Sequence, residues 1–121
     1  MLLVDDDPAF LDAVEALIER AGGLEVVARA ANGEEALRRA AELMPDVITM
    51  DLDMPVMDGL DATRMISAYF NLPIAVVTGS DVTEQVEQAL AAGAAAHVVK
   101  SKAGDALVPT LRTAARRSQR H

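Results

Sequence analysis

The sequence predicts one doubly wound α/β domain, in which a five-stranded parallel sheet is covered by five helices. Three observations indicate this fold class. Short apolar runs alternate with amphipathic helical patterns along the whole chain, the connections between them are short, and 121 residues suffice for one hydrophobic core. Right-handed crossovers between parallel strands then place helices on both faces of the sheet.

The first elements are a strand, a helix and a second strand. The apolar triplet Leu2–Val4 predicts the first strand. Asp7 followed by Pro8 is typical of a helix N-cap and a first helical residue, and the apolar spacing beyond them continues to the glycine pair at 22–23. Residues 24–30, with two valines at their centre, predict the second strand.

The middle of the chain leads to a buried strand. Asn32 and Gly33 supply a cap and turn for a helix predicted over 34–43, which Pro45 ends. The apolar run Val47–Met50 then suits a strand that is buried on both faces of a parallel sheet.

The second half of the chain continues the alternation. Its predicted elements are a helix over 60–70, a strand over 74–77, a helix over 82–92, a strand within 94–99 and a last helix through Leu107, Leu111 and Ala115. We expect Ser101 to cap this last helix. Pro109 predicts that the helix either starts close to the proline or bends there.

The composition limits the possible functions. Eleven basic and 19 acidic residues give a formal charge of −8, which argues against a domain that itself grips nucleic acid or anionic lipid. Without cysteine, no disulfide, zinc–thiolate site or thiol nucleophile can form. We found neither an apolar run of membrane-spanning length nor the basic stretch of a secretory signal. We therefore expect a soluble cytoplasmic domain.

Polar residues follow four of the predicted strands: Asp5 and Asp6, Asp51, Thr78 and Lys100. Carboxyl ends of parallel strands share one edge of a sheet, so these side chains should meet there. Three carboxylates repel one another unless a cation compensates, and a hard divalent ion such as Mg²⁺ prefers oxygen ligands. A carboxylate nucleophile beside a metal, an ammonium group and a hydroxyl group predicts formation of an acyl phosphate.

These residues lie in motifs that resemble those of response-regulator receiver domains. The matching segments are LLVDDDP at 2–8, PDVITMDLDMPVMDG at 45–59, VVT at 76–78 and VVK at 98–100. The resemblance implies a flavodoxin-like, three-layer sandwich with strand order 2-1-3-4-5. It also implies a receiver domain over 1–121, of which about 112–121 form the end of the last helix or the start of a linker.

The resemblance assigns roles to the clustered residues. Asp51 would accept a phosphoryl group from the phosphohistidine of a sensor histidine kinase, and Thr78 and Lys100 would hold the phosphoryl oxygens. The implied ligands of Mg²⁺, for which Mn²⁺ is a possible substitute, are Asp6 and Asp51 directly, Asp5 through water and Asp53 through its backbone carbonyl.

Further implications concern signalling. His97 stands where the family usually has an aromatic residue that moves inward on activation, so it is the candidate switch residue. The face formed by helix 82–92, strand 94–99 and the last helix would then control a partner, a phosphorylation-dependent homodimer or an output domain. The similarity is greatest to receivers that precede LuxR-type helix-turn-helix domains, so DNA would be bound only through a domain absent from this chain. The chain is then either a fragment or a stand-alone receiver. The resemblance also implies that it is a signalling phosphoacceptor and not an enzyme, with no catalysis beyond its own phosphorylation and dephosphorylation.

The chain departs from the family pattern at several positions. Asp53 is acidic where many members are neutral, and Ser101 replaces the proline that often follows the lysine, which disfavours a cis peptide there. The first strand is short and begins close to Met1, which is compatible with a natural start upstream of this residue.

Two enzyme or binding alternatives start from the same residues. Asp51-Leu52-Asp53 also resembles the Asp-x-Asp of haloacid-dehalogenase-type phosphatases, which usually carry that pair after their first strand and have a longer chain. A flavin- or nucleotide-binding module would need a phosphate-binding loop where this chain has three consecutive aspartates. A receiver that only binds partners is disfavoured because every functional position is filled.

Overall fold

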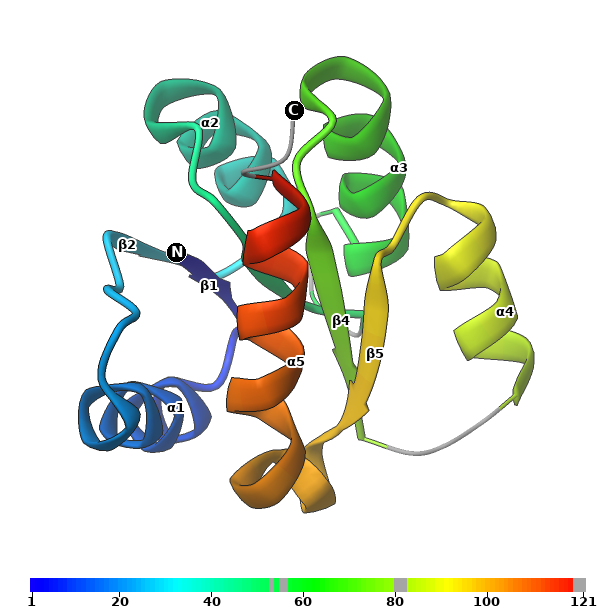
Figure 1. The fold of residues 1–121 in the computed structure, drawn as a ribbon. Helices are drawn as coiled ribbons and strands as arrows, with labels where there is room; N and C mark the ends of the chain where they lie inside the picture. The colour runs from blue at the N-terminus through cyan, green and yellow to red at the C-terminus, as the bar shows by residue number, and fades with distance from the viewer. Residues whose placement is uncertain (53, 55–56, 80–82, 119–121) are drawn as a thin grey trace.

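The computed structural model describes residues 1–52, 54, 57–79 and 83–118. Strands and helices alternate from β1 to α5, as Figure 1 shows. The elements are β1 Leu2–Val4, α1 Pro8–Ala21, β2 Ala28–Ala30, α2 Gly33–Leu43, β3 Ile48–Asp51, α3 Gly59–Phe70, β4 Ile74–Thr78, α4 Thr83–Ala91, β5 Ala96–Val99, the 3-10 turn η1 Lys100–Lys102 and α5 Ala103–Ser118. None of the described helices is long and apolar enough to span a membrane.

The five strands form one parallel sheet in the order β2-β1-β3-β4-β5, which confirms the predicted topology. The register aligns the ends of the central strands: Asp51 pairs with Val77, and Thr78 pairs with Val99. The carboxyl ends of these strands therefore lie along one edge of the sheet.

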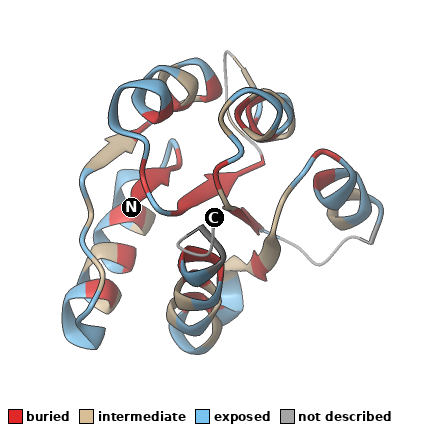
Figure 2. Ribbon diagram, turned by 45° about the horizontal axis from the view of Figure 1, so that its top comes forward, coloured by how far each residue is buried: buried red, intermediate tan, exposed pale blue. Residues whose placement is uncertain are grey.

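Each face of the sheet carries its own hydrophobic cluster, so the molecule has three layers. Successive residues of β1 point to opposite faces, with Leu3 in one cluster and Leu2 and Val4 in the other. Helices α1 and α5 cover the first face, while α2, α3 and α4 cover the second. The central strands β1, β3 and β4 are buried along their whole length, whereas the outer strands β2 and β5 are mostly intermediate (Figure 2).

Side-chain caps set the start of three helices. Asp7 accepts a hydrogen bond from the Ala9 backbone N–H at the start of α1, and Asn32 accepts one from Glu35 N–H at the start of α2, as the sequence predicted. Asp58 caps α3 in the same way.

The second strand is shorter than predicted. The expected strand 24–30 is reduced to Ala28–Ala30 because its ladder partner β1 has only three residues. Val27 still donates its N–H to the Met1 carbonyl oxygen at 2.9 Å, but its side chain is half exposed.

The start of the last helix was also predicted wrongly. Ser101 lies inside η1, and α5 begins after that turn, so Ser101 is not the helix cap. Pro109 lies within α5, which starts at Ala103 and continues to Ser118. The helix therefore does not start close to the proline. The described residues contain no cis peptide bond, in line with the expectation for Ser101.

Candidate functional site

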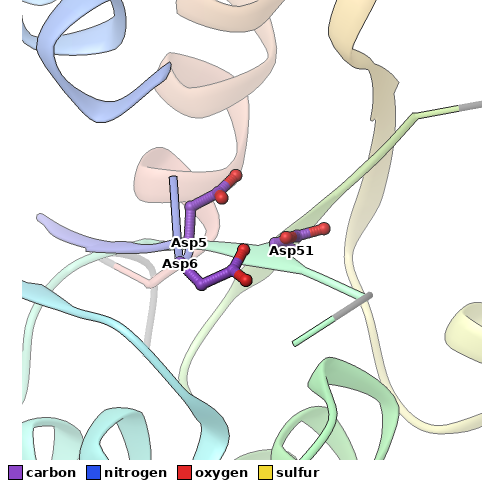
Figure 3. A group of neighbouring side chains, drawn as sticks. All are labelled: Asp5, Asp6 and Asp51. Atoms are coloured by element: carbon purple, nitrogen blue, oxygen red, sulfur yellow. The ribbon is translucent and has the colours of Figure 1, made fainter. Parts of the chain in front are cut away.

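Three carboxylates gather at the carboxyl edge of the sheet. Asp5 and Asp6 come from the connection between β1 and α1, and Asp51 is the last residue of β3 (Figure 3). Each offers a carboxylate oxygen, and these oxygens all lie within 4.8 Å of one another. Asp5 and Asp51 are 2% and 3% exposed, whereas Asp6 is exposed, so the cluster opens to solvent on the Asp6 side.

Backbone hydrogen bonds fix the first part of this cluster. The Asp5 N–H donates to the Ala30 carbonyl oxygen of β2 at 3.0 Å, which continues the strand ladder by one residue. Asp5 Oδ1 in turn accepts from the Asp7 N–H at 2.9 Å. One carboxylate oxygen of Asp5 thus holds the turn that leads into α1, and the other, Oδ2, remains for the site.

The start of α3 packs directly against the backbone of Asp51. The Gly59 N–H donates to the Leu52 carbonyl oxygen at 3.2 Å. A side chain at Gly59 would collide with the Asp51 carbonyl oxygen and would lie 2.7 Å from Leu52 Cα. Only glycine allows this approach, so the start of α3 packs closely against the backbone that carries the Asp51 side chain.

Lys100, the first residue after β5, brings a positive charge to the cluster. Its Nζ lies 2.8 Å from Asp5 Oδ2 and 3.7 Å from Asp51 Oδ2. The 2.8 Å contact is an ion pair, and Asp5 Oδ2 has no regular hydrogen-bond donor among the described residues. Burial acts to lower the pKa of Lys100, but the contact with Asp5 and the charge of Asp51 outweigh burial and raise it.

Thr78 ends β4 and contacts the neighbouring strand. Its side chain is fully buried, and its Oγ1 lies 2.9 Å from Nε2 of His97 on β5. The predicted switch residue and the predicted phosphoryl-binding hydroxyl are therefore hydrogen-bonded partners in this structure.

The donor set suits a divalent cation. Asp6 is solvent-accessible, Asp51 is adjacent to it, and Asp5 Oδ2 lacks a regular hydrogen bond. Oxygen-only ligands that leave room for water are the preference of hard ions such as Mg²⁺. The residues present thus fit a metal at this acidic pocket.

The structure brings together most of the predicted site residues. Asp5, Asp6, Asp51 and Lys100 meet at one point, and Thr78 lies at the end of the strand next to β3. Asp53, whose backbone carbonyl was a predicted ligand, lies outside the described residues.

One member of the site was not anticipated from the sequence. The Lys100 ammonium lies over the ring of Phe10, 4.6 Å from its centroid. In the sequence Phe10 is an ordinary apolar position of an amphipathic helix. The only sign in the sequence that Phe10 lies near the site is its place in the first turn of that helix, next to the acidic loop.

The fold and the site together define a class of protein: a parallel α/β domain with an acidic cation-binding pocket and a lysine at the carboxyl edge of its sheet. The family model of the response regulator receiver domain matches residues 1–112. The chain belongs to the response-regulator receiver family and is a receiver domain of two-component signalling. Receiver domains of this family are phosphorylated by sensor histidine kinases.

Solved structures of receivers superpose closely on this chain. The receiver domain of the putative response regulator NarL from Mycobacterium tuberculosis has a TM-score of 0.90 at 28% identity, covering 95% of this chain and 94% of that one. A LuxR-family two-component response regulator from Aurantimonas sp. SI85-9A1 has a TM-score of 0.90 at 35% identity, with 95% and 83% covered.

The curated relatives of this chain are named as enzymes and not as transcription regulators. The chain is 51% identical over 80 residues to protein-glutamate methylesterase/protein-glutamine glutaminase 3 of Hahella chejuensis, covering 66% of this chain and 23% of the relative. It is 40% identical over 101 residues to the corresponding protein of Alkalilimnicola ehrlichii, covering 82% and 26%. The similarity thus spans about a quarter of the length of these relatives.

Proposed function

We propose that Asp51 is the phosphoacceptor, and that it takes its phosphoryl group from the phosphohistidine of a sensor histidine kinase. One observation carries this assignment. Asp51 is a nearly buried carboxylate at the carboxyl edge of the sheet, and it shares that edge with two further carboxylates and the Lys100 ammonium.

The transfer is a displacement at phosphorus. An Asp51 carboxylate oxygen attacks the phosphorus atom, the P–N bond to the kinase imidazole breaks, and the imidazole nitrogen leaves with the electron pair. Lys100 stands 3.7 Å from Asp51 Oδ2, a position from which it can donate to an oxygen of the arriving phosphoryl group. The Thr78 hydroxyl, at the end of the adjacent strand, would donate to another.

The metal belongs to the same proposal. Asp6 and Asp51 would hold Mg²⁺ directly, Asp5 would hold it through water, and the Asp53 carbonyl would complete the protein ligands, with Mn²⁺ as a possible substitute. When bound, the ion supplies positive charge that offsets the repulsion between the carboxylates and the phosphoryl oxygens.

Intact-mass analysis after incubation with Mg²⁺ and a small phosphodonor tests the acceptor. Wild type should gain the mass of one phosphoryl group, and Asp51→Asn should gain none. Asp61→Asn is the matched control, because Asp61 is an exposed carboxylate on α3 that pairs with Arg64. Equal labelling of wild type and Asp51→Asn would show that the acceptor is elsewhere. Turnover of a phosphate monoester that is lost in Asp53→Asn would favour the phosphatase alternative instead.

The signalling output is proposed to be the face formed by α4, β5 and α5. Phosphorylation would replace the single carboxylate charge of Asp51 by nearly two negative charges on the phosphoryl oxygens. Movement of Thr78 toward these oxygens would strain its hydrogen bond to His97. His97 would then transmit the change to β5, where a partner or a second copy docks. If His97→Ala leaves phosphorylation-dependent dimerisation unchanged, the switching role of His97 is wrong.

The output domain that responds to phosphorylation can be of two kinds. The LuxR-family neighbour is in line with a DNA-binding output, whereas the curated relatives are in line with a methylesterase output in the same polypeptide. The coding sequence that follows the codon for His121 distinguishes a stop codon, a helix-turn-helix domain and an esterase domain. We propose that the receiver domain extends over residues 1–121, that it acts in the cytoplasm, and that its output is transcriptional.

A further inference from the structure

The Lys100 ammonium has an aromatic neighbour as well as its two carboxylate neighbours. Its Nζ lies over the Phe10 ring at 4.6 Å from the centroid, 2.8 Å from Asp5 Oδ2 and 3.7 Å from Asp51 Oδ2. We propose that Phe10 is a positioning residue, whose ring face keeps the Lys100 ammonium beside Asp51 so that Lys100 can bind the phosphoryl group. This inference rests on the proposed role of Lys100.

Lys100 needs such support because its side chain is long and partly exposed. The side chain is 28% exposed, and its four methylene groups allow the ammonium to turn toward solvent. The contact with Asp5 Oδ2, at 2.8 Å, is the shorter of its two carboxylate contacts, and Asp51 Oδ2 lies 3.7 Å away. A second attraction on the ammonium would favour the inward position.

An aromatic ring has a specific advantage in that position. The negative face of the ring attracts a cation without accepting a full hydrogen bond. The ammonium can therefore keep its N–H donors for Asp5, Asp51 and the oxygens of a phosphoryl group. A third carboxylate in the place of Phe10 would compete for these donors and would repel the phosphoryl group.

The fold holds the ring in place. Phe10 lies in the first turn of α1, which Asp7 caps, and it packs against the hydrophobic cluster between α1, α5 and the sheet. Its ring is half buried, so one part is anchored in the cluster while the ring face meets Lys100.

The sequence makes a matched experiment possible because it contains only two phenylalanines, Phe10 and Phe70. Phe70 is half buried at the end of α3, with its ring 6.4 Å from that of Tyr69. Mono-, di- and trifluorinated phenylalanine weaken the negative ring face stepwise at nearly constant shape. In the Phe70→Leu variant, the fluorinated residue replaces only Phe10, so any effect comes from position 10. In the Phe10→Leu variant it replaces only Phe70, so any effect comes from position 70.

The measured quantities are the rate of Asp51 phosphorylation by a small phosphodonor and the NMR signal of the Lys100 side-chain methylene next to the ammonium. We expect the rate to fall stepwise with fluorination at position 10, to a total of about 2- to 30-fold, and not at position 70. Phe10→Leu should shift the Lys100 signal by removing the ring current. In a Lys100→Met background, Phe10→Leu should leave the remaining rate unchanged.

The outcomes separate this inference from the proposed function. Three results would each overturn the positioning role while Asp51 remains the acceptor. The Lys100 signal could be unshifted in Phe10→Leu, the phosphorylation rate could be unchanged by fluorination at position 10, or Phe10→Leu could reduce the rate equally in the Lys100→Met background. If Lys100→Met phosphorylates at the wild-type rate, the proposed role of Lys100 fails, and the positioning role fails with it. Urea unfolding of each variant identifies any that lose the rate by failing to fold.

Discussion

The Thr78 hydroxyl oxygen lies 2.9 Å from His97 Nε2, which joins the end of β4 to the middle of β5 through side chains. In the proposed switch, movement of Thr78 toward Asp51 would lengthen this hydrogen bond. His97 would therefore restrain Thr78 in the unphosphorylated protein. This relationship couples the interior of the site to the strand that faces α4 and α5.

The first prediction follows from that restraint. His97→Phe keeps a ring on β5 but removes the hydrogen bond, so phosphorylation of Asp51 should become about two- to tenfold faster, in keeping with the net strength of one hydrogen bond. Phosphorylation kinetics by intact mass provide the measurement. In a Thr78→Val background the same substitution should have no effect, and a persistent effect there would show that His97 acts by another route.

The close approach of α3 to the acceptor strand predicts a large effect at Gly59. Gly59→Ala would force the helix away from the Asp51 and Leu52 backbone, and should reduce the free energy of unfolding by about 2 to 3 kcal/mol. Chemical denaturation measures this change. Gly104→Ala is the control, since a Cβ there meets nothing within 4 Å, and it should be stabilising by up to about 1 kcal/mol. Similar values for the two variants would contradict the packing described.

The repulsion among the three carboxylates predicts that the Asp51 charge destabilises the metal-free fold. With chelator present and with Lys100→Met in both proteins, which removes the ion pair to Asp51, Asp51→Asn should raise the free energy of unfolding by about 1 kcal/mol, because one of three carboxylate charges within 4.8 Å is removed. Mg²⁺ at ten times its dissociation constant should stabilise wild type by about 1.4 kcal/mol and Asp51→Asn by less. Asp61→Asn should respond to Mg²⁺ as wild type does. An equal response of wild type and Asp51→Asn would place the metal elsewhere.

The raised pKa of Lys100 predicts a loss of stability in alkaline solution. A lysine whose pKa is higher in the folded state contributes stability that is fully present below its unfolded pKa of about 10.4. That contribution is lost as the pH rises through the higher folded pKa. Denaturation of wild type and Lys100→Met between about pH 9 and pH 11, in chelator, should therefore show the stability difference shrinking as pH rises. A difference that grows with pH would contradict the ion pairs of Lys100 with Asp5 and Asp51.

The order of the elements and the place of the site could be predicted from the sequence because both depend on chain-local patterns. Apolar runs separated by helical periodicity define the alternation, and parallel strands bring their carboxyl ends to one edge. Asp5, Asp51 and Lys100 were therefore expected at one point, where their side chains lie.

The remaining details depend on tertiary contacts that no local pattern encodes. The length of β2 follows from its ladder with the three residues of β1, so the valines of the predicted strand 24–30 fall outside it. The hydrogen bond of His97 to Thr78 and the ring contact of Lys100 with Phe10 depend on side-chain conformations across different elements. Spacing in the chain gives no direct information on either.

Both outer strands of the sheet are short, since β2 has three residues and β5 has four. Long, flat strand edges present rows of N–H and C=O groups on which further chains can add, as in amyloid fibres. Edges of this length give an incoming chain few such groups. We therefore expect concentrated solutions of this domain to resist fibril formation, and its associations to be made by helix surfaces rather than by sheet extension.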